Sequence, residues 1–419
     1  MRKISFWIIA LAFLEACQPG IHSDKDNAGL KLPEGFSALI FADDIGHARH
    51  IDINSNGDVY VSLNRVKNGG GMVCLRDENN DGKADVIKYH GIYDGTGIKI
   101  HNGYVYFGVD TLIVRYQLKE GDLVPVENAE IIAGGFTVQN QHTTKPLTFD
   151  QAGNIYVTVG APSNACQEQD RTKGSSGMDP CPILELHGGI WRFKADVLNQ
   201  DQARDGYRYA TGIRNAVAIT WNDAENKLYA LQHGRDQLSQ FFPELYTEQQ
   251  NSQIPAEEFL LVEDGSDFGW PYCYFDLAQN KKVLGPEYGG DGLKVERCSA
   301  ADDPIMAFPA HTAPNDLLFY TGSMFPEKYK NGAFVAFHGS WNRAPQPQEG
   351  YHVVFVPFKG SIPSGEWEVF ATGFAGVEVV KSPRDAKHRP CGLAQAPDGS
   401  LFVTDDVNGR IYRIIYQPK

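Results

Sequence analysis

Polar side chains stand directly before six short apolar stretches of the sequence. Arginine binds paired oxygens through its planar fork, and a neutral imidazole can take up a proton near pH 7. If the six stretches meet around one channel, these side chains converge on one cationic pocket that favours an anionic ligand. The set consists of Arg49 or His50, Thr96, His142, Arg214 with Asn215, His311 with Thr312, and Arg389.

The element that must position His142 is the hairpin that follows it. Residues 147–149 read as a short strand, 150–153 as a polar turn and 155–159 as an alternating strand. The repeat of this pattern predicts an all-β fold, a six-bladed β-propeller of one domain with long inter-strand loops. A large sandwich of unrelated hairpins is the alternative. The five other copies lie at 50–62, 98–107, 217–229, 317–336 and 393–404.

The N-terminus reads as an export signal. Residues 1–17 begin with basic residues, continue with an apolar run and end in Leu14-Glu-Ala-Cys17, which resembles a bacterial lipobox. We expect a lipoprotein-type signal peptide ending at a lipidated Cys17, a polar tether over 18–32 and the propeller over 33–416. The protein would then be exported and held at a bacterial membrane by its lipid alone, facing the periplasm or the cell exterior. Secretion without an anchor is the alternative.

Charge and cysteine content narrow the class of protein. A formal net charge of −14 argues against a nucleic-acid partner. Six cysteines follow Cys17, an even number in an exported protein, so disulfides are expected. Cys74 and Cys391 belong to the first and last blades, where they either form a clasp or remain free buried thiols. The other pairs bracket polar loops and are Cys166 with Cys181 and Cys273 with Cys298.

A short acidic stretch resembles the first half of a calcium loop. Asp77, Asn79 and Asp81 place oxygen ligands at alternate positions. Gly82 follows at the sixth position, but Lys88 occupies the twelfth, where such a loop has a glutamate. The alternatives are a second calcium site on these three oxygen ligands and a plain hairpin turn, which uses the same residue types.

Seven short motifs follow one another along the chain. They are the His142 stretch with Val159-Gly160, Tyr207-Arg-Tyr-Ala-Thr-Gly-Ile-Arg-Asn215, His233-Gly-Arg-Asp236, Phe268-Gly-Trp-Pro-Tyr-Cys-Tyr274, His311-Thr-Ala-Pro-Asn315, Phe337-His-Gly-Ser-Trp-Asn-Arg343 and Arg389-Pro-Cys-Gly-Leu393. Each motif alone is weak, but their order over residues 33–416 resembles the glucose/sorbosone dehydrogenase family. That family consists of six-bladed propellers that use pyrroloquinoline quinone (PQQ). The similarity is greatest to its sorbosone-type branch and to the fungal pyranose dehydrogenases.

The resemblance implies the chemistry of the pocket. His142 matches the family's general base, which takes the hydroxyl proton of the substrate while a hydride passes to the quinone C5. Arg214 matches the arginine that stabilises negative charge on the quinone oxygen. Gln141 stands where the glucose enzyme has an aspartate, which leaves the orientation and basicity of the imidazole open.

Further residues are assigned to the cofactor. By resemblance, Asn215 is a neighbour of the cofactor and Arg389 grips a PQQ carboxylate. His338 and Arg343 fall where the family has additional cofactor contacts. Two more assignments rest on the convergence of the inner strands, and these are Arg49 and His311.

The resemblance also implies a catalytic calcium ion bound by backbone carbonyls, which map to Gly234 and Arg235. Such a cation polarises the C5 carbonyl as a Lewis acid. The glucose enzyme has proline at the Arg235 position. A guanidinium that turned inward there would weaken or replace the calcium.

We therefore expect a dehydrogenase that uses PQQ and calcium to oxidise a sugar or a sugar-derived alcohol or aldehyde. The electrons would pass to an external acceptor, a quinone or a cytochrome, because the sequence has neither a nicotinamide fingerprint nor a Cys-x-x-Cys-His haem motif. Two alternatives are a calcium-dependent propeller lactonase, which needs carboxylates around its metal, and a non-catalytic propeller that binds carbohydrate or protein.

Overall fold

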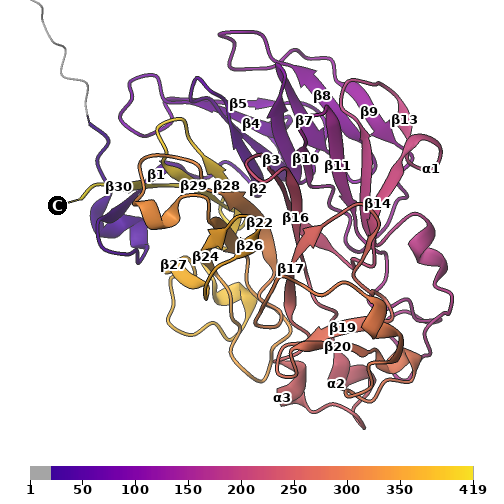
Figure 1. Ribbon diagram of the computed structural model, residues 1–419. Helices are drawn as coiled ribbons and strands as arrows, with labels where there is room; N and C mark the ends of the chain where they lie inside the picture. The colour runs from indigo at the N-terminus through magenta and orange to yellow at the C-terminus, as the bar shows by residue number, and fades with distance from the viewer. Residues whose placement is uncertain (1–19, 419) are drawn as a thin grey trace, which may run out of the picture.

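The computed structural model describes residues 20–418, and six sheets in it form the blades of a β-propeller (Figure 1). The prediction of six blades is confirmed, and each repeated stretch of the sequence supplies the first two strands of one blade. Five of the blades follow one another along the chain, and the sixth joins the two ends of the propeller.

The strands of blades 1 to 5 are as follows. Blade 1 contains β2 (Ala48–Ile53), β3 (Val59–Lys67), β4 (Gly70–Arg76) and β5 (Val86–His90). Blade 2 contains β6 (Gly97–His101), β7 (Tyr104–Gly108), β8 (Ile113–Gln117), β9 (Glu130–Gly134) and β13 (Gln200–Asp201). Blade 3 contains β10 (Leu147–Phe149), β11 (Asn154–Val159), β12 (Gly189–Lys194), β14 (Tyr207–Thr211) and β18 (Ser266–Asp267). Blade 4 contains β15 (Ala216–Asn222), β16 (Lys227–Gln232), β17 (Glu257–Val262) and β21 (Met306–Phe308), and blade 5 contains β22 (Pro314–Phe319), β23 (Ala333–Phe337), β24 (His352–Val356) and β27 (Glu368–Ala371).

Blade 6 closes the ring. Its strands β28 (Pro390–Gln395), β29 (Leu401–Asp405) and β30 (Ile411–Tyr416) come from the C-terminus, and β1 (Phe36–Ala42) comes from the N-terminus. β1 pairs with β30 in antiparallel fashion, with Phe36 opposite Tyr416. The outer strand of the last blade is therefore supplied by the start of the domain, and closure of the ring holds the two ends together.

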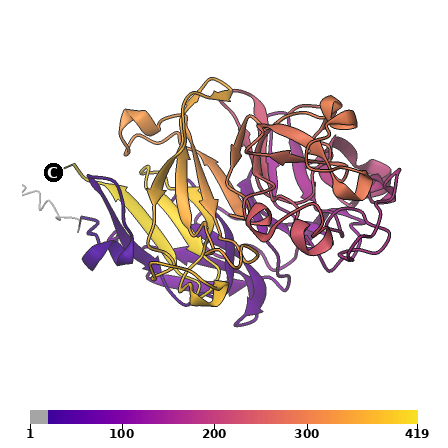
Figure 2. The same cartoon turned by 90° about the horizontal axis from the view of Figure 1, so that it is seen from below.

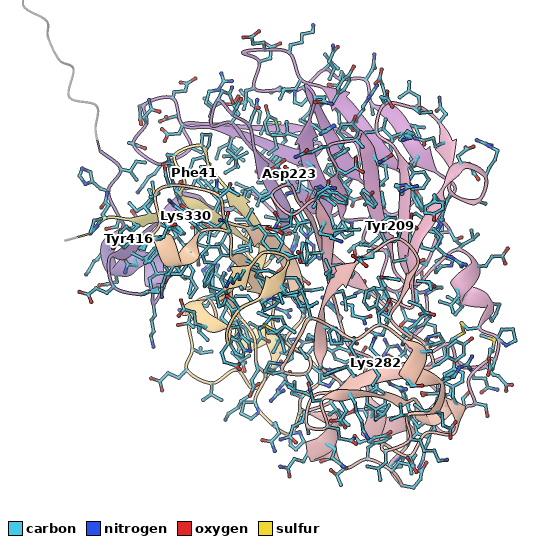
Figure 3. All side chains as sticks on the ribbon, in the orientation of Figure 1. Phe41, Tyr209, Asp223, Lys282, Lys330 and Tyr416 are labelled. Atoms are coloured by element: carbon cyan, nitrogen blue, oxygen red, sulfur yellow. A yellow bond between two sulfur atoms is a disulfide. The ribbon has the colours of Figure 1, made fainter. Side chains whose placement is uncertain are left out.

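Apolar clusters fill the spaces between neighbouring blades (Figure 3). Between blades 4 and 5, Tyr229 and Phe259 pack with Phe308 and Phe337, and the ring centroids of Phe308 and Phe337 are 5.0 Å apart. All five residues of β23 are buried. A strand in the middle of a blade has another blade against each of its faces, which explains why such strands read as continuous apolar runs in the sequence.

Loops from blades 3 and 4 form a body beside the ring, which we call the annex (residues 161–188, 237–256 and 268–301). In Figure 1 its strands β19 and β20 and helices α2 and α3 project at the lower right, and Figure 2 shows the same body from below. The two predicted disulfides, Cys166–Cys181 and Cys273–Cys298, are both present in it. Its elements are η2 (Pro182–Glu185), α2 (Leu238–Phe241), α3 (Glu248–Asn251), β19 (Cys273–Asp276), β20 (Lys281–Leu284), η3 (Pro286–Tyr288) and η4 (Glu296–Ala300).

A buried ion pair ties the annex to the ring. Lys282 Nζ, on β20, lies 3.1 Å from Glu258 Oε2, on β17, and Lys282 is labelled in Figure 3. Cys74 and Cys391, by contrast, are buried free thiols. Of the two alternatives for this pair, the clasp between the first and last blades is therefore not formed.

The N-terminal segment is described from Gly20 onward, so the expected signal peptide over 1–17 lies outside the described residues. The described part of the expected tether packs against the ring, since Asp24 accepts a hydrogen bond from Ile40 N and Leu30 is buried. None of the helices between residues 20 and 418 has the length and apolarity needed to cross a membrane. The remaining short elements are η1 (Lys25–Gly29), α1 (Gln202–Asp205), η5 (Glu327–Tyr329), β25 (Phe358–Lys359), β26 (Ile362–Pro363) and η6 (Pro383–Asp385).

Candidate active site

A polar cavity of about 280 Å³ lies where the chain enters the inner strands β10, β15 and β22. It brings together four residues that the sequence predicted, His142, Arg214, Asn215 and His311, and it also exposes the expected metal-binding residue Gly234. The convergence of inner-strand entries on one pocket is therefore confirmed for blades 3, 4 and 5. The other lining residues are Gln141, Arg171, His233, Asp236, Glu257, Ala313, Trp341 and Asn342.

The local backbone fixes the imidazole of His142. Its φ of 52° lies in the left-handed region that side chains rarely adopt, and Gly160 leaves the room for it, because a Cβ there would lie 2.6 Å from the His142 Cβ. His142 Nδ1 lies 2.6 Å from the carbonyl oxygen of Ala161, so Nδ1 carries the proton and Nε2 keeps its lone pair. Burial, with a smaller effect of Arg214, lowers the pKa of His142 to about 3. The ring is a neutral proton acceptor at physiological pH.

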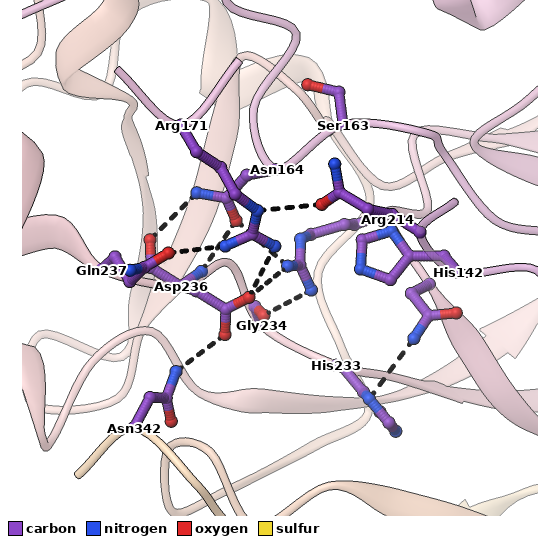
Figure 4. A network of polar contacts seen from close by, with 12 residues as sticks. His142, Ser163, Asn164, Arg171, Arg214, His233, Gly234, Asp236, Gln237 and Asn342 are labelled. Carbon is purple, nitrogen blue, oxygen red and sulfur yellow. Dashed lines mark hydrogen bonds and ion pairs between the residues drawn. The ribbon is translucent and has the colours of Figure 1, made fainter. Parts of the chain in front are cut away.

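Two arginines share one carboxylate beside this ring (Figure 4). Asp236 Oδ2 lies 2.6 Å from Arg214 Nη2 and 3.1 Å from Arg171 Nη2. Asn342 Nδ2 donates to the other oxygen, Oδ1, at 2.7 Å. Burial alone would raise the pKa of Asp236, but Arg214, together with His311 and Arg171, outweighs burial and holds that pKa well below its usual range. The carboxylate therefore stays ionised and fixes both guanidinium groups.

Arg214 keeps two of its five N–H donors unused. Its Nη1 donates to the Gly234 carbonyl oxygen at 2.9 Å and its Nη2 donates to Asn164 and Asp236, whereas its buried Nε has no hydrogen-bond partner among the described residues. A buried donor without an acceptor costs about 1–3 kcal/mol, so such groups mark a place where a ligand supplies the acceptor. Burial also lowers the pKa of the neighbouring His233 to about 4, which keeps this imidazole neutral as well. The site thus fits a ligand that presents an anionic or carbonyl oxygen to Arg214.

A buried carboxylate joins two of the loops that form the cavity. Glu257 Oε2 accepts from Gly234 N at 2.9 Å, and Glu257 Oε1 accepts from Ala313 N at 3.0 Å. Burial raises the pKa of Glu257 to about 8 despite these two hydrogen bonds. Glu257 thereby sets the spacing between the entries of blades 4 and 5.

The carbonyl oxygens expected to bind calcium remain accessible in part. Arg235 turns its side chain away from the cavity and forms a buried ion pair with Glu287 of the annex, so its guanidinium does not occupy the metal position. Among the described residues, the Arg235 carbonyl oxygen accepts no hydrogen bond, and the Gly234 carbonyl accepts one from Arg214 and keeps its second lone pair. The described residues contain no cluster of three or more His, Cys, Asp or Glu side chains that could hold a metal. A cation here would thus rely on backbone oxygens and its ligand.

Three other predicted cofactor residues form a separate cluster. Asp406 Oδ2 lies 2.9 Å from Arg49 Nη1, and Asp406 Oδ1 lies 2.8 Å from His338 Nε2. Arg389 Nε donates to the His338 carbonyl oxygen at 3.0 Å. These side chains come from blades 1, 5 and 6 and contact one another, but they do not line the cavity that contains His142.

Arg343, assigned to the cofactor by resemblance, is held by backbone carbonyls and by a glutamate. Its Nη1 donates to the carbonyl oxygens of Ser252 at 2.6 Å and Ala310 at 3.1 Å, and its Nη2 lies 2.9 Å from Glu349 Oε1. Backbone carbonyls of the annex and of blade 4 therefore occupy the guanidinium, which lies outside the cavity. Its neighbours in sequence, Trp341 and Asn342, line the cavity instead.

The residues named for a second calcium site form a turn. Asp77 Oδ2 accepts from Gly82 N at 2.8 Å, Asn79 Oδ1 accepts from Asp81 N at 2.8 Å, and Asp81 Oδ1 accepts from Lys83 N at 2.9 Å. Asp and Asn side chains support a hairpin turn in this way. The calcium site on these three residues stays a prediction.

Several residues of the cavity were missed by the sequence analysis. Asp236 belongs to the His233-Gly-Arg-Asp236 motif, so that motif carried a signal for it. Glu257 sits in an apolar strand, and Arg171 sits in a loop between two cysteines whose conformation no local pattern predicts. The position of Arg171 at the cavity depends on tertiary contacts and is seen only in the three-dimensional structure.

The model of a family described as TrAA12-like matches residues 30–417 of the chain. The chain is 30% identical over 209 residues to an uncharacterized protein of Borreliella burgdorferi, across 50% of this chain and 48% of that protein. It is 29% identical over 276 residues to the pyrroloquinoline quinone-dependent pyranose dehydrogenase of Coprinopsis cinerea, across 58% of this chain and 36% of that protein. The matches thus span about half or less of the length of these two relatives.

Two solved structures share the fold. The holo form of the pyranose dehydrogenase PQQ domain from Coprinopsis cinerea superposes with a TM-score of 0.72 at 21% identity, over 92% of this chain and 97% of that chain. The calcium structure of the Trichoderma reesei Carbohydrate-Active Enzymes Family AA12 protein gives a TM-score of 0.75 at 19% identity, over 93% and 97% of the two chains.

Proposed function

The chain belongs to the TrAA12-like family, and on that premise we propose that it is an oxidoreductase that oxidises a sugar, or a sugar-derived alcohol or aldehyde, with PQQ. One observation carries the proposal: within residues 20–418, the neutral imidazole of His142, with Nε2 unbonded, shares a cavity with Arg214, whose buried Nε lacks a partner. The first is suited to remove a proton and the second to stabilise negative charge. The name of the Coprinopsis cinerea relative supports the choice of cofactor.

The reaction follows from the residues of the cavity. PQQ, when bound, supplies a two-electron acceptor. His142 Nε2 takes the hydroxyl proton of the substrate, and the Nδ1–H bond to the Ala161 carbonyl keeps the ring in the required tautomer. Arg214 stabilises the developing negative charge without moving, because Asp236 and the Gly234 carbonyl already hold its guanidinium. The substrate thus loses a proton to His142 and a hydride to the acceptor, and becomes a lactone, a carbonyl compound or, from an aldehyde hydrate, an acid.

Further residues would hold the cofactor. Arg214 and Asn215 line the cavity. Arg389 lies in the cluster with Arg49 and His338, where its Nε and Nη2 donate to the carbonyl oxygens of His338 and Gly339, so its Nη1 remains for a carboxylate of the cofactor. Arg49 and His338 would act there through Asp406, to which both are bound. A calcium ion would use the carbonyl oxygens of residues 234 and 235 and supply Lewis-acid chemistry.

The cellular context is also a proposal. The lipobox-like Leu14-Glu-Ala-Cys17 supports export and a lipid anchor at Cys17. The lack of a haem or nicotinamide motif in the sequence supports an external electron acceptor, a quinone or a cytochrome. The formal net charge of −14 makes nucleic acid an unsuitable partner.

The proposal is tested by titrating the apoprotein with PQQ, with and without calcium, and following the quinone absorbance. We expect saturable binding that weakens by tenfold or more in Arg214→Ala and Arg389→Ala, since each removes a charged hydrogen-bond donor. Arg297→Ala is the matched control, because Arg297 pairs with Asp179 on the surface of the annex. Absence of binding by the unmodified protein at micromolar PQQ would overturn the proposal.

A further inference from the structure

The annex supplies one arginine to the cavity. Arg171 lies in the loop that the Cys166–Cys181 disulfide closes, and its φ of 52° is in the left-handed region. A residue with a side chain in this region is strained and persists only where its surroundings impose the conformation. The loop therefore holds Arg171 in a conformation that a free loop would avoid.

Three hydrogen bonds hold the guanidinium of Arg171 (Figure 4). Nε donates to Gln141 Oε1 at 2.8 Å, Nη1 donates to Gln237 Oε1 at 2.6 Å, and Nη2 lies 3.1 Å from Asp236 Oδ2. Arginine has five N–H donors, so two remain for a ligand. Gln141, which replaces the aspartate expected before the base, thus positions Arg171.

Arg171 lies nearer the solvent than the other arginine of the cavity. Its side chain is 28% exposed, compared with 4% for Arg214. A ligand that enters the cavity therefore meets Arg171 before it reaches Arg214. Gln141, which accepts a hydrogen bond from Arg171, directly precedes His142 in the chain, and all three residues line the same cavity.

The groups that line the cavity carry more positive than negative charge. Arg171 and Arg214 share one carboxylate, that of Asp236. Glu257 also lines the cavity, but burial raises its pKa to about 8, so it is mostly protonated at neutral pH. Asp170 lies 4.0 Å from Arg171 Nε and stays ionised, so it offsets part of the charge of Arg171 from outside the cavity.

We propose that Arg171 is the substrate-binding residue that selects sugars bearing a carboxylate, such as uronic acids. The inference rests on the proposed function and names its substrate class. The fork of Arg171 presents two N–H donors at the entrance, a geometry that matches the two oxygens of a carboxylate. A neutral sugar offers no charge to this group and binds less tightly.

The test compares matched pairs of substrates on the PQQ-loaded protein: glucuronate with glucose, and galacturonate with galactose. We expect the acids to give the higher kcat/KM. Arg171→Gln should lower kcat/KM for the acids by about 10- to 100-fold, the range for loss of a charged hydrogen bond, and for the neutral sugars by less than threefold. Arg171→Lys, which keeps the charge but not the fork, should recover part of the loss. Arg297→Gln, elsewhere on the annex, is the control.

Two binding measurements show whether the carboxylate that Arg171 binds belongs to the sugar substrate or to PQQ. Calorimetric titration of the apoprotein with glucuronate should show binding that Arg171→Gln abolishes, whereas PQQ titration should give the same Kd for both proteins. A PQQ Kd that rises tenfold or more in Arg171→Gln would assign Arg171 to the cofactor and overturn the inference. Equal kcat/KM for acids and neutral sugars would also overturn it and leave the proposed function intact. Failure of PQQ to bind the unmodified protein would instead refute the proposed function.

Discussion

The ring and the annex are stabilised in different ways and contribute different residues to one cavity. The ring consists of six similar sheets with apolar clusters between them, and it supplies His142 and Arg214 from the entries of inner strands. The annex has two short paired strands and short helices, and two disulfides cross-link it. It supplies Arg171. On the functions proposed above, the repeated part of the chain supplies the catalytic residues and the irregular part supplies the residue that selects the substrate.

The largest effect is expected for the ring's base. His142→Ala removes the proton acceptor, and loss of general-base catalysis costs about 10²- to 10⁴-fold in kcat. Steady-state kinetics with an artificial dye as acceptor measure this, and PQQ titration should show that the cofactor still binds. His101→Ala is the control, since that imidazole stacks on Phe149 outside the cavity. Activity of His142→Ala within threefold of the unmodified protein would mean that another group removes the proton.

The next effect concerns the packing of the ring. Phe334 is fully buried in β23 and contacts a group of aromatic side chains, with its ring centroid 4.7 Å from that of Phe370. Phe334→Ala should lower the free energy of unfolding by about 3–5 kcal/mol because it leaves a cavity. Val369→Ala, at a position that is 46% exposed, should change it by less than about 0.5 kcal/mol. Denaturant unfolding measures both variants, and equal midpoints would contradict this account of the ring.

The difference between the repeated ring and the irregular annex also explains which features the sequence could predict. Strand pairs in the ring repeat, so six copies of one pattern identified the blades, and the polar residue before each inner strand identified His142, Arg214 and His311. The annex has no repeat. Its cysteine spacing predicted both disulfides, but the path of the chain between Cys166 and Cys181, which brings Arg171 to Asp236, depends on tertiary contacts. The position of Arg343 depends on tertiary contacts as well, since carbonyls from two distant segments hold it.

The two disulfides of the annex allow a matched test of its role. Loop entropy predicts that removing Cys166–Cys181, with a sequence separation of 15, costs about 3 kcal/mol. The Cys273–Cys298 bridge, with a separation of 25, should cost about 0.5 kcal/mol more. Only the first closes the loop that carries Arg171, so the Cys166→Ser, Cys181→Ser variant should lose discrimination between glucuronate and glucose. Kinetics on the two double variants measure this, and equal loss in both would show that the annex acts as one unit.

The smallest expected effect is that of pH on activity, and it depends on the surroundings of His142 in the ring. Only the neutral imidazole accepts a proton, so activity falls as pH drops through its pKa. Burial lowers that pKa to about 3, so more than about 99% of the ring is neutral at pH 5. Asp236, whose pKa is held below its usual range, also stays ionised there. An imidazole with an ordinary pKa near 6.5 would be only about 3% neutral at pH 5.

We therefore expect kcat to change less than twofold between pH 7 and pH 5, compared with a loss of about 25-fold for an imidazole of ordinary pKa. Initial rates in buffers of constant ionic strength measure this, and circular dichroism at each pH checks that the fold persists. A fall with a midpoint between pH 6 and 7 would mean that the surroundings of His142 do not lower its pKa in the working enzyme.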